Sequence, residues 1–131
     1  MGPKLGRLQL RILQILWERK QATAREITDA LEQTEPISHS TVQTLLRKLE
    51  AKGAVAHTAD DGQRAFVFRP LYRESEVTET ATRDLLTRVF GGSVYGLVAH
   101  LFQHEKISRE EMARLRRLIG EEGEEEEGAR R

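Results

Sequence analysis

Ile37-Ser-His-Ser-Thr-Val-Gln-Thr-Leu-Leu-Arg-Lys-Leu-Glu-Ala-Lys-Gly53 is the stretch that decides the fold of this chain. Its apolar residues recur at i, i+3, i+4 and i+7, the spacing of one stripe along a helix, and they are Val42, Leu45, Leu46 and Leu49. Ser38 is placed to cap the beginning of such a helix, and Gly53 can adopt the left-handed conformation that ends one. The stretch therefore predicts a short helix with one buried face.

The opposite face of this predicted helix suits DNA. Its side chains can hydrogen-bond to a base edge or a phosphate, and they are Ser40, Gln43, Thr44 and Arg47. No acidic residue occurs on this face before Glu50. A helix that is anchored on one side and polar on the other fits the major groove. The competing interpretation of each polar residue is a solvated helix surface.

We assign base contacts to the beginning of this helix, because a glutamine amide there can pair with adenine through two hydrogen bonds. The predicted base-contact residues are His39, Ser40, Thr41, Gln43 and Thr44. Cationic side chains and the beginning of a neighbouring helix more often meet backbone phosphate. The predicted phosphate-contact residues are Thr23, Ala24, Arg25, Arg47, Lys48 and Arg64.

The residues that follow predict a wing. Two short strand-like runs, 54–59 and 64–69, are separated by Asp60-Asp-Gly-Gln63, which has turn chemistry. Pro70 ends the second strand. The aspartates at the tip repel phosphate, so we expect the wing to lie along the DNA backbone or to be a passive hairpin. Helix, hairpin and stop form the second half of a winged helix-turn-helix.

Two further helices precede the recognition helix. Residues 6–19 carry a broad apolar band, and residues 20–22 form a loop after it. Thr23-Ala-Arg-Glu26 has capping-box spacing and begins a helix that reaches about residue 33. Pro36 pushes the residue before it out of helical geometry and so marks a turn. The predicted fold class is mainly α with a small β-hairpin wing, a winged helix-turn-helix DNA-binding domain at residues 1–72.

Residues 73–120 predict three more helices, with Gly120 ending the last. These three helices are too short to enclose a hydrophobic core alone. We therefore expect a second copy of the same segment to bury their apolar faces in a symmetric dimer. The predicted dimerisation residues are Val77, Ala81, Leu85, Leu86, Val89, Phe90, Leu97, Val98, Leu101, Phe102, Met112, Leu115 and Ile119. Residues 121–131 hold 6 Glu and one apolar residue, so we expect an acidic, disordered tail.

Composition narrows the function. Residues 1–73 hold 12 Lys and Arg against 8 Asp and Glu, a net +4 beside the proposed DNA reader. The chain has no cysteine, which excludes disulfides and thiolate metal sites. No apolar run approaches membrane-spanning length, so we expect a cytoplasmic protein without membrane insertion.

Catalysis and metal binding find little support in the sequence. Nucleotide-binding glycine loops, nucleophile elbows and paired catalytic carboxylate motifs are absent, so an enzyme is not expected, and neither is a cofactor. His100 and His104 have the i, i+4 spacing that can chelate zinc, but no further ligand is obvious nearby. We therefore assign no metal site and interpret the pair as surface or interface histidines.

The order of these elements resembles the penicillinase-repressor family, the BlaI/MecI/CopY group of bacterial transcriptional regulators. The resemblance covers about residues 5–119. The strings that carry it are Ile15-Leu-Trp17, Ala24-Arg-Glu-Ile27, the helix at residues 38–49, Phe66-Val-Phe68, Leu86-Thr-Arg-Val-Phe-Gly-Gly92 and Leu97-Val98. The Phe-Gly-Gly and Leu-Val elements beside a winged helix are the most specific part.

The resemblance implies a homodimeric repressor that covers an inverted-repeat operator in double-stranded DNA. It also implies removal of the repressor by proteolysis, through a membrane sensor-protease or its downstream protease. The family's cleaved bond aligns with His100 and Leu101, where its best-known members have Asn-Phe. The copper-responsive branch uses C-terminal cysteines, which this chain lacks.

Two other functions compete with this one. A ligand-sensing winged-helix regulator would need an apolar pocket between the reader and the dimer helices. A winged helix used only for protein-protein contacts would usually lose its polar reader face, whereas this chain keeps Gln43, Thr44 and Arg47.

Overall fold

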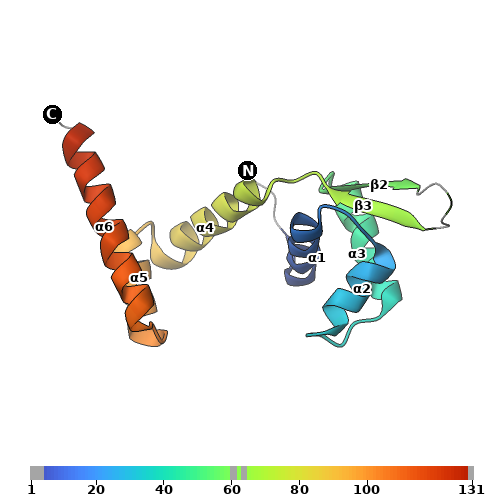
Figure 1. Ribbon diagram of the computed structural model, residues 1–131, viewed down its shortest axis with the longest axis horizontal. Coiled ribbons are helices and arrows are strands. Elements are labelled where there is room, and N and C mark those ends of the chain that lie inside the picture. Colours follow the sequence, from blue (N-terminus) through green and yellow to red (C-terminus); the bar gives the residue numbers. More distant parts are fainter. Residues whose placement is uncertain (1–4, 60–61, 63–64, 130–131) are drawn as a thin grey trace. The chain divides into compact units, whose positions relative to one another are not determined.

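A computed structural model of the chain describes residues 5–59, 62 and 65–129 (Figure 1). In chain order the elements are α1 (Arg7–Arg19), β1 (Ala22–Thr23), α2 (Ala24–Glu32), α3 (His39–Ala51), β2 (Val55–Ala59), β3 (Phe66–Pro70), α4 (Glu74–Phe90), α5 (Val94–His104) and α6 (Arg109–Ala129). The chain divides into two compact units, Met1–Asp84 and Leu85–Arg131. The division falls within α4, later than the boundary that we predicted after residue 72.

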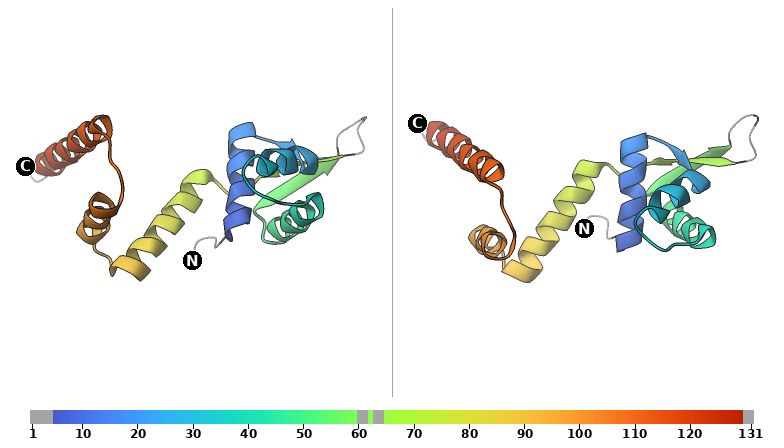
Figure 2. Two further views of the ribbon diagram at one scale, coloured as in Figure 1. Left: turned by 90° about the horizontal axis from the view of Figure 1, so that it is seen from below. Right: turned by 60° about the horizontal axis from the view of Figure 1, so that its bottom comes forward.

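The first unit is a winged helix in which α1, α2 and α3 gather beside a small antiparallel sheet (Figure 2). Their apolar stripes meet in one core with Val55 of β2, and the largest fully buried apolar side chains are Ile12, Leu13, Leu16, Ile27, Leu31, Val42, Leu46, Leu49 and Val55. Each such side chain contributes about 1.5–3 kcal/mol when it leaves water. The apolar stripe predicted along α3 is therefore confirmed, with Leu45 half-buried at its edge.

The sheet has three strands in the order β1-β3-β2, so the predicted hairpin is confirmed but is not the whole sheet. In β1, Ala22 pairs with Phe68, and in β2, His57 pairs with Phe68 from the other side. We predicted residues 20–22 as loop, which is wrong for Ala22. The β1 strand has only two residues, which is too short for a recognisable strand pattern in the sequence. It is a strand because its backbone pairs with the free edge of β3. Three of the four residues predicted for the hairpin turn lie outside the described residues, as does Arg64.

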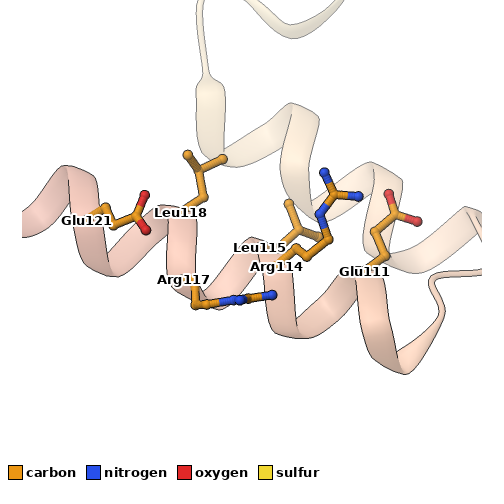
Figure 3. Close-up of a pocket in the computed structure, with 6 residues that line it drawn as sticks. All are labelled: Glu111, Arg114, Leu115, Arg117, Leu118 and Glu121. Atoms are coloured by element: carbon orange, nitrogen blue, oxygen red, sulfur yellow. The ribbon is translucent and has the colours of Figure 1, made fainter.

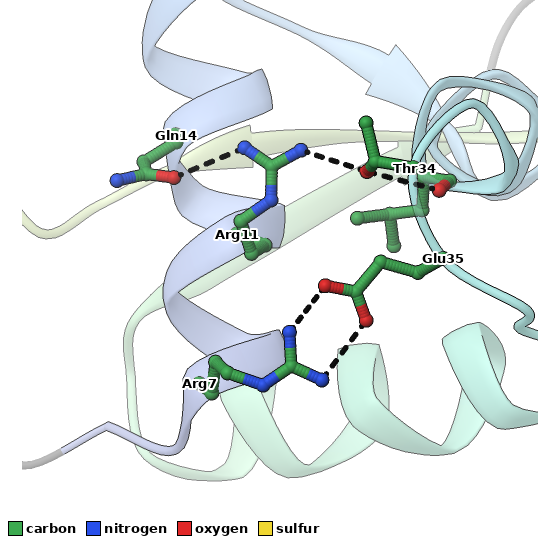
Figure 4. Close-up of polar contacts among 6 residues, drawn as sticks. Arg7, Arg11, Gln14, Thr34 and Glu35 are labelled. Atoms are coloured by element: carbon green, nitrogen blue, oxygen red, sulfur yellow. Dashed lines mark hydrogen bonds and ion pairs between the residues drawn. The ribbon is translucent and has the colours of Figure 1, made fainter.

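Polar contacts join the ends of the helices (Figure 4). Arg7 in α1 forms a two-point ion pair with Glu35 in the turn before α3, with Nη2 donating to Oε2 at 2.9 Å. The hydrogen bond from Arg7 and its charge hold the pKa of Glu35 below the ordinary value. Trp17 packs against the core and donates from Nε1 to the carbonyl oxygen of Tyr72 at 2.9 Å. These contacts connect α1 to the turn before α3 and to the chain after β3.

The residues predicted to begin and end helices in the second unit do so, except for Gly120. Gly91 and Gly92 have φ of 57° and 84° and end α4, and the Ser93 hydroxyl accepts from the Gly96 amide at 2.9 Å to begin α5. However, α6 continues through Gly120 to Ala129, so the predicted helix end and the disordered tail are both wrong over residues 121–129. Gly120 is not among the glycines with positive φ, and the glutamates that follow it are good helix formers.

No single helix of the described chain is long and apolar enough to cross a membrane. The α4 and α5 helices reach that length and composition only when taken together, as a pair bent at the break between them.

Candidate DNA-binding surface

The α3 helix is fixed by capping residues at both ends and by packing of its apolar face on the core. Ser38 is its N-cap, and the Ser38 hydroxyl accepts from the Thr41 amide at 3.2 Å. Gly53, at φ 80°, turns the chain away after the last turn. Val42, Leu46 and Leu49 are buried beneath it. The polar side chains of α3 therefore face outward on a rigid helix.

The beginning of α2 is equally well defined. The Thr23 hydroxyl accepts from the Glu26 amide at 3.1 Å, and the Glu26 carboxylate accepts from the Thr23 amide at 3.0 Å, which completes the predicted capping box. The backbone hydrogen bond from Thr23, assisted by the hydroxyl, holds the pKa of Glu26 below its ordinary value. The positive end of the helix dipole lies at this point, next to the exposed side chain of Arg25.

A hollow lies between α3, the beginning of α2 and β3. Its lining residues are Thr23, Ala24, Arg25, His39, Gln43, Leu46, Arg47, Ala65, Phe66 and Phe68. His39, Gln43 and Arg47 follow one another at i, i+4 and i+8 and so form one row along α3. The structure thus brings six of the predicted DNA-contact residues to one concave surface, three from α3 and three from the N-cap and first turn of α2.

Within that row, Gln43 is the side chain with its hydrogen-bonding groups available. It is exposed, and no other described residue bonds to it. By contrast, the Thr44 hydroxyl donates to the Ser40 carbonyl oxygen at 3.1 Å and accepts from Arg47 at 3.1 Å. A free amide on an exposed helix row is the arrangement that reading a base edge needs.

The other predicted contacts lie apart from the hollow. Ser40 and Thr41 are exposed, and their hydroxyls lie 3.2 Å and 2.8 Å from that of Ser38. Lys48 lines a separate depression beside α1, which it shares with Leu45 and the stretch from Gly6 to Gln9. The predicted phosphate contact of Lys48 therefore belongs to a different part of the surface from that of Arg25.

Two features of the hollow were missed from the sequence. Phe66 is 55% exposed, whereas Phe68 is half-buried against the core, and the ring centroid of Phe66 lies 4.5 Å from that of His57. The buried Thr28 hydroxyl contacts His39 at 3.0 Å. Residues two apart in a strand share a face, but only the assembled fold shows that Phe68 of β3 reaches the core while Phe66 does not.

The remaining candidate sites are weaker. A shallow depression on the second unit is lined by side chains of α6 alone, with Leu115 and Leu118 between charged residues (Figure 3). The rings of His100 and His104 lie 4.3 Å apart, and His100 also meets the edge of Phe90. Across the described residues, no group of three or more potential ligands could hold a metal ion.

Comparison with known proteins identifies the family. Residues 5–121, which make up nearly the whole chain, match the sequence profile of the penicillinase repressor family. The chain belongs to the penicillinase repressor family. The predicted resemblance is thereby confirmed.

Individual members of the penicillinase repressor family agree in length. The penicillinase repressor of Bacillus licheniformis is 27% identical over 119 residues, which cover 91% of each chain. The methicillin resistance regulatory protein MecI of Staphylococcus aureus is 25% identical over 108 residues, which cover 82% of this chain and 86% of MecI. The solution structure of the DNA-binding domain of the repressor BlaI is 30% identical with a TM-score of 0.50, covering 58% of this chain and 90% of that domain. The predicted winged-helix fold class is confirmed.

Proposed function

We propose that this chain is a bacterial transcriptional repressor that binds operator DNA through α3. The observation that carries the proposal is the row of His39, Gln43 and Arg47 on the hollow beside Arg25, with the Gln43 amide bonded to no other described residue. The similarity to the DNA-binding domain of BlaI is independent support for the proposal. Such a protein acts in the bacterial cytoplasm by occupying DNA and needs neither catalytic residues nor a cofactor.

Affinity and selectivity come from different residues in this proposal. Phosphate neutralisation supplies most of the affinity, and it draws on the net +4 of residues 1–73, including Arg25 and Lys48. Base edges supply the selectivity, and Gln43 is the first candidate because its amide can donate to and accept from adenine. Arg47 approaches Thr44 in the free protein, so it is placed to meet the backbone beside the reading row.

The repressor acts as a homodimer on an inverted repeat. The support is the amount of apolar surface that one copy leaves in water on α4, α5 and α6, including Val89 at 65%, Leu101 at 41% and Ile119 at 65% exposed. Large apolar side chains left exposed together are characteristic of interaction surfaces. The predicted dimer residue Val77 is only 4% exposed within one chain, so we remove it from the proposed interface.

Twelve residues remain in that interface. Those exposed in one copy are Ala81, Leu85, Val89, Val98, Leu101, Phe102 and Ile119, and those half-buried are Leu86, Phe90, Leu97, Met112 and Leu115. Two-fold symmetry would place the same residues of both copies against each other.

Relief by proteolysis is part of the proposal, with the bond between His100 and Leu101 as the candidate. Both residues are exposed, which supports access by a protease. The bond lies inside the continuous α5 helix, so that helix must open locally before an extended segment can enter a protease. A cut there would divide the apolar surface of the second unit and weaken the dimer.

The test is selection of bound duplexes from a random pool by the full chain, followed by titration of the selected duplex at two salt concentrations. We expect an inverted repeat that binds one dimer, with affinity falling steeply as salt rises. Absence of salt-dependent binding would instead favour a winged helix used for protein contacts. Selection that succeeds only after a cell extract's small molecules are added would favour the ligand-sensing alternative.

A further inference from the structure

The beginning of α3 is joined to α2 through a buried hydroxyl. Thr28 is fully buried, and its Oγ1 lies 2.8 Å from the carbonyl oxygen of Ala24 and 3.0 Å from Nδ1 of His39. The Thr28 oxygen therefore has two partners in the fold and no access to water. Which of the two receives the single hydroxyl proton determines the chemistry of the imidazole.

The proton must point at Ala24. A carbonyl oxygen can only accept, whereas an imidazole nitrogen can donate when it carries a hydrogen. If Thr28 donated to His39, two acceptor oxygens would face each other at 2.8 Å in a buried site. If Thr28 donates to Ala24, both contacts become hydrogen bonds, with Nδ1–H of His39 donating to Thr28. We assign the Nδ1–H tautomer from this network.

This assignment leaves Nε2 without a hydrogen in the neutral ring. Among the described residues none bonds to Nε2, and His39 lines the hollow of the DNA-binding surface. The charged groups that line the same hollow are Arg25 from α2 and Arg47 from α3, and both are donors. The lining residues of β3 that face it are phenylalanines, which carry no charge. His39 thus adds an acceptor beside two cationic donors, Arg25 and Arg47.

An acceptor selects its partner on DNA. Phosphate oxygens and the N7 and O6 atoms of guanine are themselves acceptors, so a bare Nε2 cannot bond to them. In the major groove the donors are the exocyclic amino groups, N6 of adenine and N4 of cytosine. We propose that His39 is a specificity-determining residue that accepts a hydrogen bond from such an amino group at the base pair under the beginning of α3. Thr28 is its positioning residue. The inference rests on the proposed function.

Two variants separate reading from folding. In His39→Asn, the side-chain amide can still donate to Thr28, but nothing remains at the position of Nε2. Thr28→Val preserves the shape of the buried side chain and removes the oxygen that orients the ring. His104→Asn in α5 is the matched control, because it changes an exposed histidine outside the reading surface.

The experiment uses the selected operator at pH 8, where an imidazole is neutral. Amino groups are removed one at a time by replacing adenine with purine or cytosine with pyrimidin-2-one. We expect one position in each half-site at which the wild type loses about three- to tenfold in affinity, the range of a single hydrogen bond. His39→Asn should show no loss at that position and normal losses at the others. The base that responds distinguishes adenine from cytosine.

Other outcomes overturn the inference. Identical profiles for the wild type and His39→Asn would mean that His39 reads nothing, while the repressor function would stand. An equal loss on every duplex would make His39 a phosphate contact. A wild type without sequence preference would remove the proposed function and the inference together. Nitrogen-15 spectra of the imidazole in the full chain at pH 8 provide a check without DNA, because hydrogen on Nε2 instead of Nδ1 would refute the assignment.

Discussion

Replacing Gln43 by alanine should separate DNA reading from stability. The side chain is exposed and has no bond to another described residue, so its removal costs no packing and no internal hydrogen bond. Alanine is also the better helix former, so the free energy of unfolding should change by less than about 0.5 kcal/mol. Loss of a two-point contact to adenine costs about 1–3 kcal/mol, which raises Kd at the cognate operator by about 5- to 150-fold.

The assay is a pair of fluorescence anisotropy titrations, one with the selected operator and one with a duplex of scrambled half-sites. Urea unfolding of the same preparations measures stability. Gln14→Ala is the control, because Gln14 is an exposed glutamine on α1 outside the hollow and accepts a long, solvent-exposed hydrogen bond of 3.4 Å from Arg11 (Figure 4). We expect Gln43→Ala to weaken binding to the operator alone, and Gln14→Ala to change neither binding nor unfolding.

Three results would refute this reasoning. A loss of equal size on both duplexes would mean that Gln43 contributes to general backbone affinity and not to reading. Unchanged binding to both would place the reader elsewhere on α3. A fall in unfolding free energy beyond about 1 kcal/mol would mean that the side chain is part of the folded structure, contrary to its exposure.

Three further predictions test the surrounding surface. Lys48→Ala should weaken binding to every duplex similarly and reduce the slope of log affinity against log salt by about one, measured by titration at several salt concentrations. Because the pKa of Glu26 is lowered in the fold, its stabilisation is complete above the ordinary carboxyl range and is lost as the pH falls through the lowered value. Acid unfolding monitored by circular dichroism should therefore depend less on pH in Glu26→Gln, and an unchanged acid limb would contradict the capping box. Ile119→Glu should shift the chain from dimer to monomer in sedimentation, whereas the exposed control Arg116→Glu should not.

Much of the reading surface follows from local sequence. The Val42 and Leu46 stripe orients α3, Ser38 begins it, and Thr23 with Glu26 begins α2. These signals can be recognised because they act between residues three or four apart, where helix geometry alone determines which side chains meet. The same local reasoning failed at Gly120, because a glycine permits a helix end without requiring one.

The chain's sequence by itself determined the winged helix, its outward polar row and the family to which it belongs, since periodicity, caps and turn residues are short-range signals. Only the tertiary structure decided that Ala22 pairs with Phe68, that Phe66 stays exposed, and that His39 lies within hydrogen-bonding distance of Thr28. Each of these depends on a free strand edge, an uncovered face or a buried hydroxyl supplied by another element. These contacts form only when the elements pack together. The sequence of either element alone therefore does not predict them.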